Sequence, residues 1–155
     1  MIRRATEADI PGITGIWNPV IHDTFVTFTD LEKTPDALAR LIAERRAAGH
    51  AFLVAEEGGR VLGFATFGPF RAGPGYRHSF EHTILIAPAA RGQGFGRGLM
   101  TALEDAARAA GGHVLFAGVS AANPEGWPST PHSATARRPG FRRSVASPAA
   151  GSTSC

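Results

Sequence analysis

A glycine-rich segment at residues 91–97, Arg-Gly-Gln-Gly-Phe-Gly-Arg, limits the possible folds of this chain more than any other feature. It follows a strand candidate at 80–86 and precedes a helix candidate at 99–110. A strand, a glycine turn and a helix are therefore expected in this order. Another strand is predicted at 113–119, so the helix must cross over between two parallel strands. The segment thus indicates an α/β fold.

The preceding residues add two helices and three strands to this unit. We expect a short strand at 1–5 and a helix that starts at the N-cap Thr6 and ends near Asn18-Pro19. A second helix is expected from Thr34 to Gly49, followed by a hairpin whose strands, 51–55 and 61–67, flank a glycine turn. With 155 residues and no internal repeat, the chain is expected to form a single domain.

The composition changes at residue 127, after which Pro, Ser, Thr, Ala and Arg dominate. We therefore predict one folded domain over residues 1–126 and a disordered tail over residues 127–155. The net charge is +3, and the tail alone carries +4 from four arginines and no acid, which leaves −1 for residues 1–126. Because the predicted domain is not basic and the tail lacks an aromatic pattern, a nucleic-acid partner is not expected.

Other features exclude further classes of protein. No apolar run approaches the about 20 residues that cross a membrane, and no signal sequence is recognisable, so a cytoplasmic location without a membrane partner is expected. The lone Cys155 offers no disulfide partner within the chain. The six histidines show no ligand spacing, so no metal site is expected.

The glycine segment has two interpretations from its residues alone. Glycines allow the backbone to approach a phosphate closely, and the start of a helix attracts anions, so residues 91–97 suit a pyrophosphate. The alternative is an ordinary strand-to-helix turn. A P-loop is excluded because no Gly-Lys-Ser/Thr follows, and the spacing does not fit a dinucleotide fold.

Several further motifs resemble one enzyme family. Arg-x-x-Gly-x-Gly after a strand that ends in Ile-Ala-Pro is similar to the coenzyme A motif of GNAT acetyltransferases. Phe67–Arg71, Gly75–His78, Phe80–His82 and Leu53–Glu57 resemble the phosphinothricin and methionine sulfoximine acetyltransferases. The resemblance covers about four-fifths of the chain. It implies a GNAT-like mixed sheet flanked by helices, an N-acetyltransferase activity, and acetyl-CoA as cosubstrate.

The resemblance also implies the site residues. It assigns the general base to Glu81, which its strand neighbours are expected to desolvate partly. Backbone contacts to the acetyl-pantetheine arm are implied for Ile84, Leu85 and Ile86. The pyrophosphate is implied to lie against Arg91, Gly92, Gln93, Gly94, Phe95, Gly96 and Arg97, with Asn123 as a further contact to the coenzyme.

The substrate is expected to be a small amino acid such as phosphinothricin or methionine sulfoximine. Arg71 and Arg77 are candidates to bind its anionic or polar groups, because guanidinium groups match such oxygens in two-point contacts. Phe28 and Phe70, together with Phe25, are candidates to line its side chain, although phenylalanines lie more often in the core. His78 and His82 are candidates to relay protons to or from Glu81.

The resemblance ends abruptly after residue 126. The family continues there with Phe-His, then Leu-Gly-Tyr/Phe-Arg-Glu, and finishes near Trp-x-Asp-Leu-Val. With permitted synonymous codons, the frame shifted to the third base gives Phe-His-Ala-Pro-Leu-Gly-Tyr-Arg-Glu from Ser129 onward and Trp-Val-Asp-Leu-Val near the end. We therefore hypothesise that one base near the Gly126 codon was lost, in the gene or in its record.

A shifted frame affects the expected fold and assembly. The family's final strands should be missing or disordered, which leaves the preceding strand with an uncovered edge. The resemblance also implies a homodimer, the family's frequent assembly, whose surface an altered C-terminus is expected to change. Two alternatives to the expected function stay open: acetylation of another amine such as a peptide N-terminus, and a non-catalytic remnant that only binds coenzyme A.

Overall fold

Six strands of the described residues form one mixed sheet in the order β1-β2-β3-β4-β5-β6. The fold comes from a computed structural model that describes residues 1–23, 31–118 and 142–146. The strands are β1 Ile2–Arg4, β2 Phe52–Glu57, β3 Arg60–Pro69, β4 Ser79–Ile86, β5 Val114–Gly118 and β6 Arg142–Ala146. The pairs from β1 to β4 are antiparallel, whereas β4–β5 and β5–β6 are parallel. The predicted parallel crossover is confirmed.

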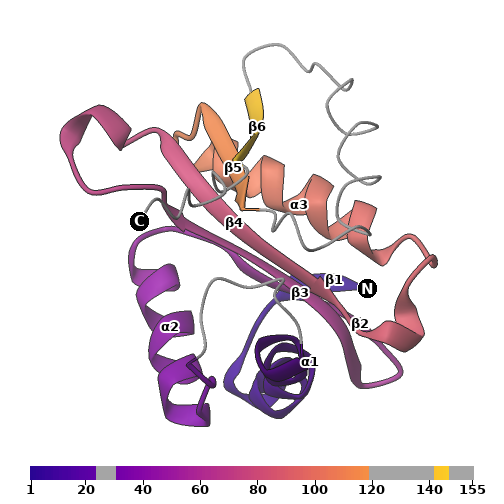
Figure 1. The fold of residues 1–155 in the computed structure, drawn as a ribbon. Helices are drawn as coiled ribbons and strands as arrows, with labels where there is room; N and C mark the ends of the chain where they lie inside the picture. Colours follow the sequence, from indigo (N-terminus) through magenta and orange to yellow (C-terminus); the bar gives the residue numbers. More distant parts are fainter. Residues whose placement is uncertain (24–30, 119–141, 147–155) are drawn as a thin grey trace, which may run out of the picture.

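Three helices cover the two faces of this sheet. α1 (Ile10–Asp23) and α2 (Pro35–Ala47) lie below the sheet in Figure 1, and α3 (Phe95–Ala109) lies above it. Short 3-10 turns stand at η1 (Glu7–Asp9), η2 (Pro74–Tyr76) and η3 (Pro88–Ala90). The predicted α/β sheet flanked by helices is therefore confirmed. None of the described helices has the length and apolar character needed to cross a membrane.

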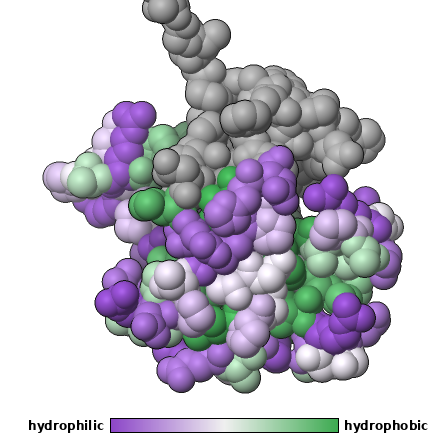
Figure 2. Space-filling view, turned by 60° about the horizontal axis from the view of Figure 1, so that its bottom comes forward, coloured by the Kyte–Doolittle hydropathy of each residue, from purple (hydrophilic) through white to green (hydrophobic). Residues whose placement is uncertain are grey.

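The alternation of side chains along the strands separates two apolar cores. Phe52, Val54 and Phe64 pack against α1 and α2, whereas Leu53, Ala65 and Phe67 pack with Leu99 and Leu103 of α3. On the face shown in Figure 2, hydrophilic residues alternate with groups of hydrophobic ones. Each face of the central strands is thus covered by a helix layer.

α1 runs past the point at which the sequence predicts its end. The helix continues through Pro19 to Asp23, although a proline lacks the N–H that would bond the carbonyl four residues earlier. Trp17 and Ile21, which flank the proline, are both buried. Burial of these two large side chains outweighs the lost hydrogen bond, so the predicted end near Asn18-Pro19 is wrong.

The predicted tail contains a strand. Arg142–Ala146 forms β6, which pairs in parallel with Val114–Gly118 of β5. The prediction of a tail without regular structure is therefore wrong for these five residues. The physical reason is the outer edge of β5, whose N–H and C=O groups need partners that a parallel strand supplies. The rest of the predicted tail lies outside the described residues.

An ionic cluster joins β1 to the start of α1. The Arg3 guanidinium donates to both carboxylate oxygens of Asp9 at 2.8 Å and to Glu56 at 3.0 Å. Asp9 also accepts from the backbone N–H and the hydroxyl of Thr6, which completes the predicted cap. The hydrogen bond from Arg3 is the main cause that lowers the pKa of Asp9 to about 2, against desolvation that raises it.

We predict that this cluster makes stability fall in acid. Because the folded pKa of Asp9 lies below its unfolded value, the ionised carboxylate stabilises the fold above about pH 4. This contribution, roughly 2 kcal/mol, is lost as the pH falls from about 4 to 2. Chemical denaturation should show Asp9→Asn less stable than the parent at pH 7 and equal to it near pH 2. The control Glu7→Gln removes an exposed neighbouring acid and should behave like the parent; equal behaviour of the two variants would contradict the assignment.

Candidate active site

The register between β3 and β4 decides which backbone groups of β4 remain for a ligand. The N–H of Ala87 bonds the carbonyl of Leu62, and the N–H of Phe70 bonds that of Ser79. Hydrogen-bonded and non-hydrogen-bonded pairs alternate in an antiparallel ladder. Ile84 and Ile86 therefore direct their N–H and C=O groups away from β3, toward the β5 side.

β5 leaves β4 before it reaches these two residues. The parallel pairing runs from Ser79↔Val114 to His82↔Ala117 and ends there. Within the described residues, no strand pairs with 83–86 on this side of β4. The backbone of Ile84 and Ile86 thus offers donors and acceptors to an extended ligand. The predicted backbone contact of Leu85 does not fit this register, because its N–H and C=O groups face Phe64 of β3.

The glycine segment forms the start of α3. The helix begins at Phe95, four residues earlier than the sequence predicts, because Gly94 serves as its N-cap with φ +86° and its carbonyl accepts from the N–H of Gly98. Gly92 has φ +76°. Both glycines adopt the left-handed region that other residues avoid. Phe95, Gly96 and Arg97 consequently occupy the first helical turn.

This turn has the properties of an anion site. The first N–H groups of a helix have no partner within the helix, and Gly94 has no side chain to cap them. The helix dipole adds positive potential at the same place. Gln93 braces the loop through a hydrogen bond from Nε2 to the Ala89 carbonyl at 2.8 Å, and Arg91 and Arg97 are exposed at its rim. The predicted pyrophosphate residues therefore fit such a group.

Glu81 lies on the other face of the sheet, which α1 and α2 cover. Its cross-strand partners are Gly68 of β3 and Phe116 of β5. Leu85, four residues along the same strand, packs into the core of α1 and α2, which fixes this orientation. The side chain of Glu81 is exposed, so its strand neighbours do not bury it. A carboxylate in this position can accept a proton from a group that approaches from the α1–α2 side.

Aromatic side chains extend from Glu81 along the same face. Phe70 stacks on Phe116 with ring centroids 4.0 Å apart and planes at 18°. The Arg71 guanidinium lies 5.0 Å from the centroid of the Phe70 ring and 5.9 Å from that of Tyr76. The structure thus brings the predicted residues Phe70 and Arg71 into one group close to Glu81.

The other predicted polar residues are arranged differently. The Nε of Arg77 donates to Nε2 of His78 at 2.9 Å, and Nδ1 of His78 lies 2.7 Å from the Gly111 carbonyl. His78 also stacks on His113. Strand alternation places His78 and His82 on the α3 face, opposite Glu81. The predicted proton relay from these histidines is therefore wrong for this geometry.

Two residues near Glu81, Phe116 and Arg45, were not predicted from the sequence as site residues. Phe116 could have been found from the expected parallel pairing, which places it beside Glu81. Arg45 projects from α2 over Gly68, where a side chain on that glycine would overlap its guanidinium. Arg45 follows Leu38 and Ile42 at helical spacing, so a charged residue in the core-facing stripe was the available signal. Phe25, Phe28 and Asn123 lie outside the described residues.

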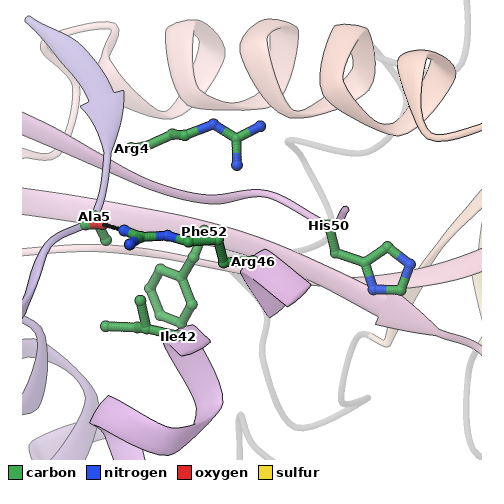
Figure 3. Close-up of a pocket in the computed structure, with 6 residues that line it drawn as sticks. All are labelled: Arg4, Ala5, Ile42, Arg46, His50 and Phe52. Carbon is green, nitrogen blue, oxygen red and sulfur yellow. Dashed lines mark hydrogen bonds between the residues drawn. The ribbon is translucent and has the colours of Figure 1, made fainter. Parts of the chain in front are cut away.

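A separate hollow lies at the β1–β2 edge of the sheet, away from Glu81. Arg4, Ala5, Ile42, Arg46, His50 and Phe52 line it. Figure 3 shows the Arg46 side chain against Ala5, whose carbonyl accepts its hydrogen bond at 3.4 Å. The two sites are two strands apart in the sheet. The hollow is therefore distinct from the group around Glu81.

The sheet, its diverging β4–β5 pair and the helix after the glycine segment agree with the comparison to known families. Residues 17–128 match the acetyltransferase (GNAT) family. The chain belongs to the GNAT acetyltransferases. This match ends close to residue 126, where the sequence changes character.

Relatives of this GNAT protein share most of its length. The L-methionine sulfoximine/L-methionine sulfone acetyltransferase of Salmonella typhimurium is 38% identical over 122 residues, which cover 79% of this chain and 71% of that protein. The L-amino acid N-acyltransferase MnaT of Escherichia coli has the same identity and coverage. The phosphinothricin N-acetyltransferase of Streptomyces coelicolor is 33% identical over 125 residues, covering 79% and 73%.

Solved structures support the same assignment. A ribosomal-protein-alanine N-acetyltransferase from Brucella melitensis superimposes with a TM-score of 0.81 and 36% identity over 86% of this chain and 82% of that one. A structure from Salmonella typhimurium with its cofactor acetyl-CoA has a TM-score of 0.80 and 35% identity, covering 86% and 76%. The predicted acetyl-CoA cosubstrate is therefore confirmed for this GNAT fold.

We predict that Gly94→Ala weakens acetyl-CoA binding. A side chain at φ +86° costs roughly 1–2 kcal/mol and turns the first N–H groups of α3 away from the anion. The KM for acetyl-CoA should rise about tenfold, as expected for one lost hydrogen bond. Gly49→Ala is the matched control, since Gly49 has φ +73° and equally open surroundings. Both variants should lose similar thermal stability, but only Gly94→Ala should raise the KM for acetyl-CoA. An unchanged KM in Gly94→Ala would contradict the anion site at the start of α3.

Proposed function

We propose that this GNAT protein transfers acetyl from acetyl-CoA to the amino group of a small amino acid such as methionine sulfoximine or phosphinothricin. The observation that carries the proposal is the composition of β4. Within six residues this strand presents Glu81 on one face and, at its edge, backbone groups of Ile84 and Ile86 that no described strand pairs. An acceptor amine and an extended thioester can therefore meet along one strand.

The roles of the residues follow from this arrangement. Acetyl-CoA would supply the activated acetyl group as a thioester: the amide bond to the acceptor nitrogen forms as the carbon–sulfur bond breaks, and coenzyme A leaves as the thiol after taking up a proton. Glu81 removes a proton from the acceptor ammonium, directly or through a water, so that the nitrogen lone pair becomes available. The N–H groups at the edge of β4 position the acetyl-pantetheine arm and stabilise the oxyanion that develops on its carbonyl. The N–H groups of residues 95–97 and the side chains of Arg91 and Arg97 hold the pyrophosphate, and Asn123 is proposed as a further contact.

Arg71, Arg77, Phe28 and Phe70 are proposed as the acceptor site. The cation–π contacts of Arg71 with Phe70 and Tyr76 support this proposal. The two rings would give the acceptor site an apolar wall, and the guanidinium would add a positive charge to it. Such a wall suits the side chain of phosphinothricin or methionine sulfoximine, which ends in an anionic or polar group. The relatives named for these substrates support the same class. We also propose a cytoplasmic location and a homodimer.

A peptide N-terminus is the second candidate acceptor. The similarity to a ribosomal-protein-alanine N-acetyltransferase favours it. Acetyl-CoA turnover on matched free amino acids and alanine-led peptides distinguishes the two. Turnover on the peptides alone would exclude the free amino acid as the substrate class.

We predict that Glu81→Gln lowers kcat with methionine sulfoximine by about 10²- to 10⁴-fold, because the amide cannot accept the ammonium proton. The KM for acetyl-CoA should be unchanged, since this residue lies on the face opposite α3. Glu57→Gln is the control, because Glu57 is an exposed carboxylate at the end of β2. A kcat close to that of the parent would remove Glu81 from its assigned role. Acetyl-CoA binding by the parent without any turnover would instead establish the non-catalytic remnant.

We further predict that the gene encodes the family's C-terminal sequence motifs in another reading frame. DNA sequencing after the Gly126 codon should give Phe-His-Ala-Pro-Leu-Gly-Tyr-Arg-Glu in the shifted frame, because the permitted codons allow it at the expected position. The intact mass of the expressed chain then distinguishes a slip in the gene from one in its record. Stop codons or an unrelated amino-acid sequence in that reading frame would refute the hypothesis.

A further inference from the structure

Arg45 is a cation in the part of α2 that faces the sheet. It follows Leu38 and Ile42 along one helix face, and both of these side chains are buried. Its guanidinium lies against Gly68 of β3, at the place where a side chain on residue 68 would stand. The glycine therefore makes room for the arginine head on the α1–α2 face of the sheet.

The described residues supply no ion-pair partner to this guanidinium. Within the described residues it forms no ion pair and no side-chain hydrogen bond, and its Nε is buried without a partner. Burial lowers the pKa of Arg45, and the adjacent Glu44 opposes this shift only in part. Because a partly buried cation without a partner is unfavourable, an anion that reaches this place gains a strong charge-assisted contact.

The position of the guanidinium relative to Glu81 defines what kind of anion fits. Gly68 and Glu81 are direct cross-strand partners. Side chains in such a pair stand about 5 Å apart on one face of the sheet. Arg45 and Glu81 consequently occupy neighbouring positions with opposite charge, and they form no ion pair with each other. A ligand that carries a cation and an anion one carbon apart matches both groups.

We propose that Arg45 binds the α-carboxylate of the amino-acid substrate and thereby presents the α-amine to Glu81. The inference rests on the proposed function and adds a specificity-determining residue to it. Arg71 and Arg77, which have other partners, are left for the distal group of the substrate. The zwitterion of a free amino acid is the chemical feature that this pair recognises.

The test compares two acceptors that differ only in the carboxylate: methionine sulfoximine and its decarboxylated amine. In Arg45→Met the KM for methionine sulfoximine should rise roughly 10- to 100-fold, as for a lost charge-assisted contact, while the KM for the amine stays unchanged. Arg45→Lys should recover part of the loss. Arg40→Met is the matched control, because Arg40 is an exposed arginine of the same helix.

A second variant moves the guanidinium without removing it. In Gly68→Ala the new methyl group overlaps the flexible end of Arg45, which must give way. This variant should also raise the KM for methionine sulfoximine and not that for the amine. If both variants affect the two acceptors equally, or affect neither, Arg45 only covers the sheet and the inference is wrong.

A binding measurement separates the inference from the proposed function. If the parent acetylates neither acceptor, the proposed function fails, and saturation-transfer NMR with methionine sulfoximine and coenzyme A then tests Arg45 alone. Binding by the parent and Arg40→Met but not by Arg45→Met supports the inference. Equal binding by all three, or no binding by the parent, overturns it.

Discussion

The register of β4 against β3 is the constraint on which the rest of the site depends. Two hydrogen bonds at its ends, from Ala87 to Leu62 and from Phe70 to Ser79, fix the alternation over the whole strand. A shift by one residue would exchange the two faces and would turn Glu81 into the core of α3. The same shift would direct the backbone of Ile84 and Ile86 into β3. Both halves of the site therefore follow from one strand pairing.

Glycines determine how closely the remaining elements approach this strand. Gly68 leaves space for the head of Arg45, and Gly94 allows α3 to start without a side chain over its first N–H groups. The two positions differ in kind: Gly68 is needed for its missing side chain, whereas Gly94 is also needed for its left-handed backbone. The cation beside Glu81 and the anion cradle thus lie on opposite faces of the sheet, separated by the strands.

The sequence was sufficient for features that depend on local patterns. Thr34-Pro35, Gly58-Gly59 and the segment 91–97 have short-range signals, and the structure has a helix start, a hairpin turn and a strand-to-helix loop there. The sequence was insufficient where burial of side chains decides the end of a helix or the position of a charged group. Pro19 predicts a helix end, but Trp17 and Ile21 hold α1 together beyond it. Arg45 reads as one of many surface arginines until β3 and α2 are placed together, because its role depends on a glycine 23 positions away.

The described residues of the site all lie before the segment whose sequence departs from the family. Glu81, Arg45, Phe70 and the glycine segment all precede residue 117, within the region that matches the GNAT family. β6 contributes at the opposite edge of β5, where it pairs with the side that does not face β4. The later residues therefore act on this geometry through the stability of β5. Phe116 of β5 lies beside Glu81, so a less stable β5 would disturb the surroundings of Glu81 first.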